Sequence, residues 1–259
     1  PEGVGKRTQF LSLLNSFVDV CHAIAYAHSK NIIHRDIKPS NVVIGEFGET
    51  VVVDWGLAKQ IDIASREPAG SEATVRGGTP MIQVANSAPA GLFDPVATQN
   101  GSVIGTPAFM APEQARGATH ELDRRSDTYA LGVILYVILT GRPPFHGDDV
   151  QTTLNQVVRG KFDHPRSIDR KLPSALASIC VKAISLAPED RYQTASELAD
   201  DVSRYLANEA VAAHKDSVLE RVARFCRRRP ATVVGALVST IVITVASLTT
   251  TAIVRKAHQ

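Results

Sequence analysis

The sequence has little cysteine and little net charge, and each shortage excludes a class of protein. Its 259 residues include three cysteines, far apart and without a CxxC pair, which argues against a disulfide framework and a cysteine-based zinc site. Such cysteine usage favours a reducing compartment. The histidines show no metal-ligand spacing either. With 44% hydrophobic and 21% charged residues the composition is otherwise ordinary, so collagen, a coiled coil and wholesale disorder are excluded.

The net charge of +2 conceals an uneven distribution along the chain. Residues 211–259 hold 8 basic and 2 acidic side chains, which leaves 20 basic against 24 acidic, or −4, in the rest. A general nucleic-acid binder would carry a basic face rather than one short basic tail. We therefore expect no nucleic acid among the partners of this protein.

The hydrophobic spacing predicts a domain that is mostly helical. Between residues 9 and 29, apolar side chains recur every three or four positions, which predicts an amphipathic helix. Two short β-branched runs, 42–44 and 50–53, are separated by glycines and predict a hairpin. Further helices are predicted over residues 127–140, 150–158, 174–185 and 195–208. The first of these is apolar nearly all the way round and should lie at the centre of the domain. The last begins with a predicted capping box formed by Thr194 and Glu197.

Composition divides the chain into segments. Residues 65–102 are dominated by small and polar residues without a sustained period, which predicts a long mobile loop. The last helical pattern ends near residue 208, so the predicted domain covers residues 1–208. A basic linker is expected over residues 209–230, and residues 255–259 are expected to be a short, truncated tail.

Residues 231–254 carry no charge, and fifteen of these 24 residues are Ala, Val, Leu or Ile. At 1.5 Å per residue, a helix of this length crosses a hydrocarbon core about 30 Å thick, which predicts a single transmembrane helix in contact with lipid. A buried or interfacial helix is the alternative, since eight Ser and Thr residues weaken the hydropathy. Arginines crowd the N-terminal side and indicate that the preceding domain is cytoplasmic: Arg221, Arg224, Arg227, Arg228 and Arg229. Cys226 among them is expected to be an unmodified thiol, with acylation as the alternative.

The polar residues after the first helix carry the chemistry. Asp36, Lys38 and Asn41 place a carboxylate, an ammonium group and a carboxamide within six residues, and Asp54 follows the predicted hairpin. Phosphoryl transfer from a nucleotide needs metal-held phosphates and an acceptor hydroxyl aimed in line. Asp36 is suited to contact the acceptor hydroxyl, whereas Asn41 and Asp54 offer the hard oxygen ligands that magnesium prefers.

This pattern resembles the eukaryotic-type, or Hanks-type, serine/threonine protein kinases of bacteria. Residues 34–41, HRDIKPSN, are similar to the HRDxKxxN catalytic loop, and residues 54–56, DWG, stand in the place of DFG. Residues 105–113 resemble the segment that ends in APE, and residues 126–132 resemble the buried helix behind it. Arg191 also matches an arginine of the family. Together these five motifs occur in the family's order.

The resemblance extends over about residues 9–206 and implies an α+β, protein kinase-like fold. The part present here corresponds to the mostly α C-terminal lobe with its small β-hairpin, followed by the transmembrane helix. In such a fold residues 65–102 belong to the activation segment, and Arg191 pairs with the APE glutamate, here Glu113.

The resemblance also implies the catalytic residues. Asp36 would orient the acceptor hydroxyl and accept its proton, and Lys38 would steady the transferred phosphate. A lysine two places after the aspartate is the serine/threonine-kinase form of this loop, and Thr106 agrees with it. Protein Ser and Thr side chains are therefore the expected acceptors.

The implied cofactors are ATP and Mg²⁺. Lys38, Asn41, Val43 and Asp54 would contact the metal nucleotide, with Asn41 and Asp54 as metal ligands and Val43 beneath the adenine ring. Plain strand packing is the alternative role for Val43, and the two roles are compatible.

Arg35 beside the aspartate marks kinases whose activation segment is ordered by phosphorylation, because the arginine pairs with the phosphate. We expect autophosphorylation in that segment, with Thr74, Thr79, Thr98 and Ser102 as candidates. In this family His34 is a packing residue that supports Trp55. Asp127 is an N-cap candidate for its helix, and by resemblance it bonds the backbone of the catalytic loop.

The family's glycine-rich phosphate loop and strand lysine have no counterpart before His34, where only 33 residues stand. We expect this chain to be a fragment that lacks the N-terminal lobe and is inactive alone. A relative without that lobe, serving as a scaffold, is the alternative.

Two other functions compete with a protein kinase. One is a membrane-tethered pseudokinase that serves as an interaction module, and the other is a small-molecule phosphotransferase of related fold. The APE-like segment and the buried-helix motif favour the protein-kinase branch over the second. The sequence does not decide whether the protein forms a homodimer.

Overall fold

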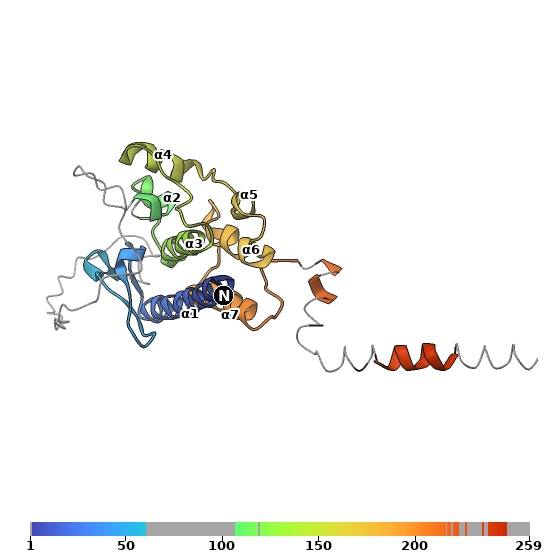
Figure 1. Ribbon diagram of the computed structural model, residues 1–259. Helices are drawn as coiled ribbons and strands as arrows, with labels where there is room; N and C mark the ends of the chain where they lie inside the picture. Colours follow the sequence, from blue (N-terminus) through green and yellow to red (C-terminus); the bar gives the residue numbers. More distant parts are fainter. Residues whose placement is uncertain are drawn as a thin grey trace, which may run out of the picture.

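A computed structural model of the chain describes residues 2–60, 107–118, 120–215, 217–218, 220–222, 226, 235 and 238–247 (Figure 1). The predictions for residues 65–102 and 255–259, with the four candidate phosphorylation sites, lie outside these ranges. The helices of the domain are α1 (Glu2–Ser29), α2 (Pro112–Ala115), α3 (Arg124–Thr140), α4 (Val150–Arg159), α5 (Pro165–Ile168), α6 (Ser174–Ala183) and α7 (Ala195–Leu206). The strands are β1 (Ile32–Ile33), β2 (Val42–Ile44), β3 (Thr50–Val52) and β4 (Lys59–Gln60).

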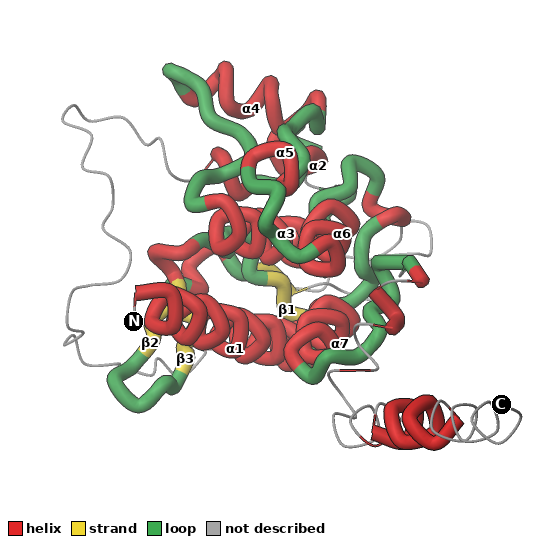
Figure 2. The backbone as a smooth tube through the Cα atoms, turned by 45° about the vertical axis from the view of Figure 1, so that its right-hand side comes forward, coloured by secondary structure: helices red, strands yellow, loops and turns green. Residues whose placement is uncertain are grey.

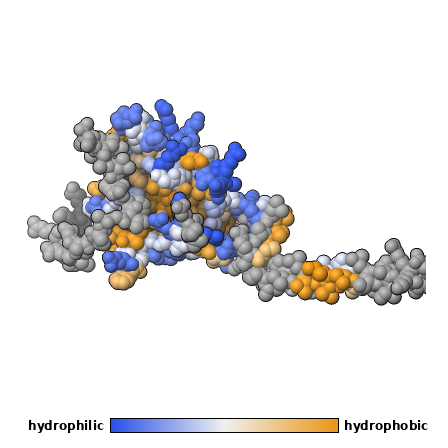
Figure 3. Space-filling model, viewed as in Figure 1, coloured by the Kyte–Doolittle hydropathy of each residue, from blue (hydrophilic) through white to orange (hydrophobic). Residues whose placement is uncertain are grey.

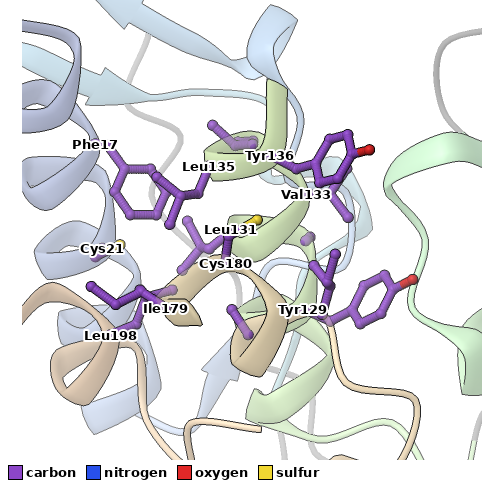
Figure 4. Packing of buried hydrophobic residues seen from close by; sticks show 14 of the residues in the cluster. Phe17, Cys21, Tyr129, Leu131, Val133, Leu135, Tyr136, Ile179, Cys180 and Leu198 are labelled. Carbon is purple, nitrogen blue, oxygen red and sulfur yellow. The ribbon is translucent and has the colours of Figure 1, made fainter. Parts of the chain in front are cut away.

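The helices form layers around α3. In both Figure 1 and Figure 2, α1 and α7 lie side by side on one side of α3 and α6, whereas α4 and α5 lie on the other. Figure 4 shows the α3 side chains that hold these layers together, and Tyr129, Leu131 and Leu135 are fully buried. The prediction of a central helix is therefore confirmed.

The central helix begins three residues earlier than predicted. The side chain of Asp123 accepts a hydrogen bond from the backbone N–H of Arg125 and so caps the helix. Asp127 lies inside the first turn and is buried, so its prediction as an N-cap is wrong. Its carboxylate does not cap the helix and instead accepts hydrogen bonds from a distant loop.

Helix α1 is the predicted amphipathic helix, extended toward the N-terminus by good helix formers such as Glu, Lys and Arg. Leu14, Phe17, Cys21 and Ile24 form its buried stripe, which packs mainly against α7. Within the described residues, Gly5–Ser29 is the one helix whose length and hydropathy would allow it to cross a membrane. Its apolar face is already used in the core of the domain.

The predicted hairpin is confirmed, with Val42 opposite Val52 and Ile44 opposite Thr50 in the antiparallel pair β2–β3. A second pair, β1–β4, joins the residues before the catalytic loop to those after the DWG sequence. The sequence did not predict this pair, because two-residue strands carry no periodic signal. Together the two strand pairs position the loop at residues 34–41 and the DWG sequence at residues 54–56.

The later helices match their predicted positions, and α7 is capped as predicted. The Thr194 hydroxyl accepts the N–H of Glu197 at 3.1 Å. The reciprocal bond differs from the ideal capping box, because the Glu197 carboxylate accepts the N–H of Gln193, at 2.9 Å, rather than that of Thr194.

Of the predicted span 231–254, the structure describes residue 235 and a short apolar helix, Val238–Ser247. The remainder lies outside the described residues. The helix exposes its apolar side chains, among them Ile241 and Ile243, and it stands out as an apolar surface in Figure 3. The transmembrane assignment stays a prediction.

Gly132 marks the closest approach of α3 to α6, and Gly132→Ala is expected to destabilise the domain. A Cβ atom there would lie 2.6 Å from the Cβ of Ala183 and 2.8 Å from a methyl of Ile184, so the helices would have to separate. We expect a loss of about 1–3 kcal/mol in the free energy of unfolding, measured by urea denaturation. Gly5→Ala is the matched control, because Gly5 lies in α1 with nothing within 4 Å and alanine there should stabilise by about 0.5–1 kcal/mol. Equal effects of the two substitutions would contradict the packing argument.

Candidate active site

The three polar groups predicted in the loop after β1 meet in the structure. The Lys38 ammonium group donates to the Asp36 carboxylate at 2.7 Å. The Asn41 side-chain nitrogen donates to the Asp36 carbonyl oxygen at 2.8 Å and approaches its carboxylate at 3.3 Å. Asn41 is buried and the Asp36 side chain is 10% exposed, so these hydrogen bonds hold the loop within the domain while a small part of Asp36 reaches the surface.

Asp54 is brought to the same place by the hairpin. The backbone N–H of Val53 donates to the carbonyl of Asn41 at 2.9 Å, so the residue after Val53 lies beside the end of the catalytic loop. Asp54 has φ 62° and ψ 62°, a left-handed conformation that a non-glycine residue seldom adopts. The side chain is exposed and open to a ligand.

The donor set fits magnesium better than a transition metal. The described residues contain no group of three or more His, Cys, Asp or Glu side chains that could hold a metal ion. The candidate site instead offers the Asp54 carboxylate and the amide oxygen of Asn41, whose nitrogen is already used as a donor toward Asp36. Carboxylate and carbonyl oxygens, completed by phosphates and water, are the usual environment of Mg²⁺.

Asp127 holds the loop backbone in place. Its carboxylate accepts the N–H groups of His34 at 2.8 Å and Arg35 at 2.9 Å. It also contacts Nε2 of His28 at 2.8 Å, in a pair that is almost fully buried. Because Arg35 has a φ of 71°, this carboxylate offsets the cost of a strained backbone next to Asp36. The family resemblance implied the contact of Asp127 with the loop, but no pattern in the sequence indicates the role of His28.

The ring of His34 packs against Trp55 with centroids 4.5 Å apart. Its Nε2 lies 3.1 Å from the carbonyl of Val53, and its Nδ1 accepts the N–H of Asp36 at 3.3 Å. The indole N–H of Trp55 donates to the carbonyl of Val52 at 3.0 Å. His34 is thus a structural link between the loop and the DWG turn, as the family resemblance implied.

The predicted pair between Glu113 and Arg191 is present and buried. Two guanidinium nitrogens donate to the two carboxylate oxygens at 2.8 Å and 2.9 Å, and the Ser126 hydroxyl adds a bond of 2.7 Å. Burial alone would raise the pKa of Glu113, but the Arg191 bond and charge outweigh it and hold this pKa below its ordinary value. The pair ties α2 to the loop before α7.

Gln114, the residue after the APE glutamate, was missed by sequence reasoning. Its side-chain nitrogen donates to the carbonyl of Arg35 at 2.7 Å and so connects α2 to the catalytic loop. A motif gives the residue types that stand together along the chain, whereas this contact joins positions 79 residues apart. No local signal distinguishes this glutamine from any polar surface residue.

Three other residues were predicted to belong to the site or to regulate it: Val43, Thr106 and Arg35. Val43 lies in β2 and is half-buried, which suits either strand packing or a ligand above it. Thr106 lies outside the described residues. The Nε atom of Arg35 is buried and has no hydrogen-bond partner in the part of the chain that the structure describes. Its pairing with a phosphate stays a prediction.

Comparison with known proteins gives separate evidence of the family. Residues 12–202 match the protein kinase domain family. The serine/threonine-protein kinase PknD of Protochlamydia amoebophila is 38% identical over 199 residues, which cover 76% of this chain and 18% of that protein. The probable serine/threonine-protein kinase PknB of Bifidobacterium longum is 38% identical over 187 residues, or 72% of this chain and 23% of its own length. PknB of Mycobacterium tuberculosis is 37% identical over 186 residues, or 72% and 25%. The chain thus spans a fifth to a quarter of the length of these relatives.

Proposed function

This chain belongs to the protein kinase domain family, and we propose that it supplies the catalytic loop of a serine/threonine kinase that transfers the γ-phosphoryl group of ATP to proteins. One observation carries the proposal. Asp36, Lys38 and Asn41 converge within hydrogen-bond distance on a single loop, and the hairpin sets Asp54 beside them. A base in contact with a cation, with two hard oxygen donors on the same loop and the adjoining hairpin, suits phosphoryl transfer.

Asp36 accepts the proton of the acceptor hydroxyl in this scheme. The bond from Asn41 to its backbone carbonyl and the bond from Lys38 to its carboxylate hold the side chain in one orientation. Such positioning supplies much of the catalysis when the transferred group itself needs little covalent help. Lys38 lies against the same carboxylate and would steady the transferred phosphate with its positive charge.

Asn41 and Asp54 would hold magnesium, and Val43 would lie beneath the adenine ring. A magnesium ion held by these two residues would supply the positive charge that neutralises the nucleotide phosphates. The oxygen donor set and the exposed Asp54 support this assignment.

The acceptor class rests on the loop and on the relatives. Lys38 stands two residues after Asp36, as in serine/threonine kinases, and Thr106 agrees with that class by resemblance. The relatives carry the same class in their names.

We also propose that residues 231–254 anchor the kinase as a single membrane span, with the catalytic lobe on the cytoplasmic side. The segment is uncharged over 24 residues, and arginines crowd its N-terminal flank. The described part of it is helical with exposed apolar side chains.

Asp54→Ala in the complete protein tests the metal site. Loss of a charged ligand should raise the Mg²⁺ concentration for half-maximal activity by at least about tenfold, because even removal of an outer-shell partner has effects of that size. The measurement is a magnesium titration of phosphate transfer from labelled ATP to a Ser/Thr protein substrate. Glu46→Ala is the control, since it removes an exposed carboxylate from the same hairpin. An unchanged magnesium dependence would remove Asp54 from the proposed site.

A further inference from the structure

The peptide group that joins Arg35 to Asp36 stands directly before the proposed base, and both of its polar atoms are hydrogen-bonded. Its carbonyl oxygen accepts the side-chain N–H of Gln114 at 2.7 Å. Its N–H, which belongs to Asp36, donates to Nδ1 of His34 at 3.3 Å. The bond from Gln114 is the shorter of the two, and it comes from α2 rather than from the loop itself. The orientation of this peptide group therefore depends on a contact with another element.

Arg35 has a backbone conformation that needs such support. Its φ of 71° is in the left-handed region, which is unfavourable for a residue with a side chain and persists only where the surroundings hold it. The two peptide groups that flank Arg35 are each held by a side chain from elsewhere in the fold. Asp127 accepts the N–H of Arg35 at 2.9 Å, and Gln114 donates to its carbonyl at 2.7 Å. Without the second bond, the peptide group before Asp36 is free to turn.

Helix α2 is itself firmly placed, so it offers a fixed origin for this bond. Glu113 is buried, bonds Arg191 at 2.8 Å and 2.9 Å, and accepts the Ser126 hydroxyl of α3 at 2.7 Å. Gln114 is the next residue along the same helix, and it is only partly buried. The helix therefore binds the core through Glu113 and the catalytic loop through Gln114.

The other contacts of Asp36 act on different atoms and do not replace this one. Asn41 donates to the carbonyl oxygen of Asp36 at 2.8 Å, and Lys38 donates to its carboxylate at 2.7 Å. Neither of these bonds holds the peptide group that precedes Asp36. Of these three contacts, the one from Gln114 is made by a residue outside the loop at residues 34–41.

We propose that Gln114 is a positioning residue for phosphoryl transfer. Its amide N–H fixes the peptide group before Asp36, and so it holds the carboxylate of Asp36 where that group accepts the proton of the acceptor hydroxyl. The inference rests on the role of Asp36 in the proposed function. Gln114 acts on the rate of the chemical step rather than on nucleotide binding, because its bond goes to the backbone before Asp36, whereas the proposed nucleotide contacts follow Asp36 in the chain.

Gln114→Met in the complete protein tests the role. Methionine keeps the length of the side chain but cannot donate a hydrogen bond. We expect kcat to fall by about 10–100-fold, since a displacement of about 1 Å near the reacting atoms can cost about 100-fold in rate. The KM for ATP should stay nearly unchanged. The measurement is initial velocity with labelled ATP and a Ser/Thr protein substrate. Gln9→Met is the matched control, because it makes the same chemical change at an exposed position of α1.

A double-mutant cycle with Asp36→Asn separates positioning from general support of the fold. If Gln114 acts through the carboxylate of Asp36, Gln114→Met should have little further effect on the rate once that carboxylate is gone. A residue that only stabilises the domain would lower the rate by the same factor in both backgrounds. Thermal unfolding of each variant is measured alongside the rates.

Two results would overturn the inference. One is an unchanged kcat in Gln114→Met, and the other is an equal loss of rate in the presence and absence of the Asp36 carboxylate. Failure of the proposed function looks different, because it would appear as full activity of Asp36→Asn with Gln114 intact.

Discussion

Asp36→Asn in the complete protein is expected to lower the rate of phosphoryl transfer by about 10²–10⁴-fold, the usual contribution of a positioned general base. The substitution keeps the size of the side chain and leaves an oxygen for the bond from Lys38. It removes the charge and basicity that the acceptor hydroxyl needs. The KM for ATP should change little, because the residues proposed to contact the nucleotide are kept: Lys38, Asn41, Val43 and Asp54.

The measurement is initial velocity with labelled ATP and a Ser/Thr protein substrate, at several ATP concentrations. Asp200→Asn provides the control, since it makes the same chemical change at an exposed position of α7. Full activity in Asp36→Asn would refute the proposed reaction mechanism. A cellular phenotype that survives the loss of phosphorylation would favour the scaffold alternative.

Arg191→Met should cost about 3–5 kcal/mol of folding free energy, the usual effect of breaking a buried ion pair from one side. The guanidinium group is fully buried and makes two bonds to Glu113, and it also donates to the carbonyls of Ser185 and Leu186. Methionine fills part of the volume but leaves the Glu113 carboxylate without its countercharge. Because domains of this size are stable by about 5–15 kcal/mol, the loss is a large share of the total.

Urea denaturation of the same chain measures the effect, with two comparisons. Arg142→Met breaks the exposed pair with Asp163, at 3.4 Å, and should cost no more than about 1 kcal/mol. The double variant Arg191→Met with Glu113→Leu should be more stable than Arg191→Met alone, because it leaves no unpaired buried charge. If the buried and exposed pairs had equal effects, the energetic role given to burial would be wrong.

The same pair predicts a dependence on pH. The pKa of Glu113 is lower in the folded protein than its ordinary value of 4.5. Stability from the pair is therefore complete above pH 4.5 and is lost as the pH falls through the folded-state pKa. Arg191→Met should lose this contribution to acid sensitivity, which a urea series at decreasing pH would reveal.

Much of the architecture follows from local patterns. The apolar spacing in residues 9–29 predicts a helix, whichever element its apolar face packs against. The β-branched runs with intervening glycines predict the hairpin. The order of Asp36, Lys38, Asn41 and Asp54 likewise identifies the kind of chemistry. These features depend on residues within a few positions of one another, so the sequence by itself determines them.

Contacts between distant residues depend on how the helices and loops pack, and only the family resemblance implied any of them, such as the pair of Glu113 and Arg191. The local pattern made Asp127 a helix-cap candidate, which is wrong, whereas the family resemblance implied its contact with the loop more than 90 residues earlier, which the structure confirms. His28 contacts Asp127, Gln114 donates to the same loop, and Asp201 accepts the N–H groups of Ala212 and Ala213, without any local pattern that marks these residues. Helical and strand periods come from backbone geometry and neighbouring side chains, whereas the partner of a buried polar group is set by which elements pack together.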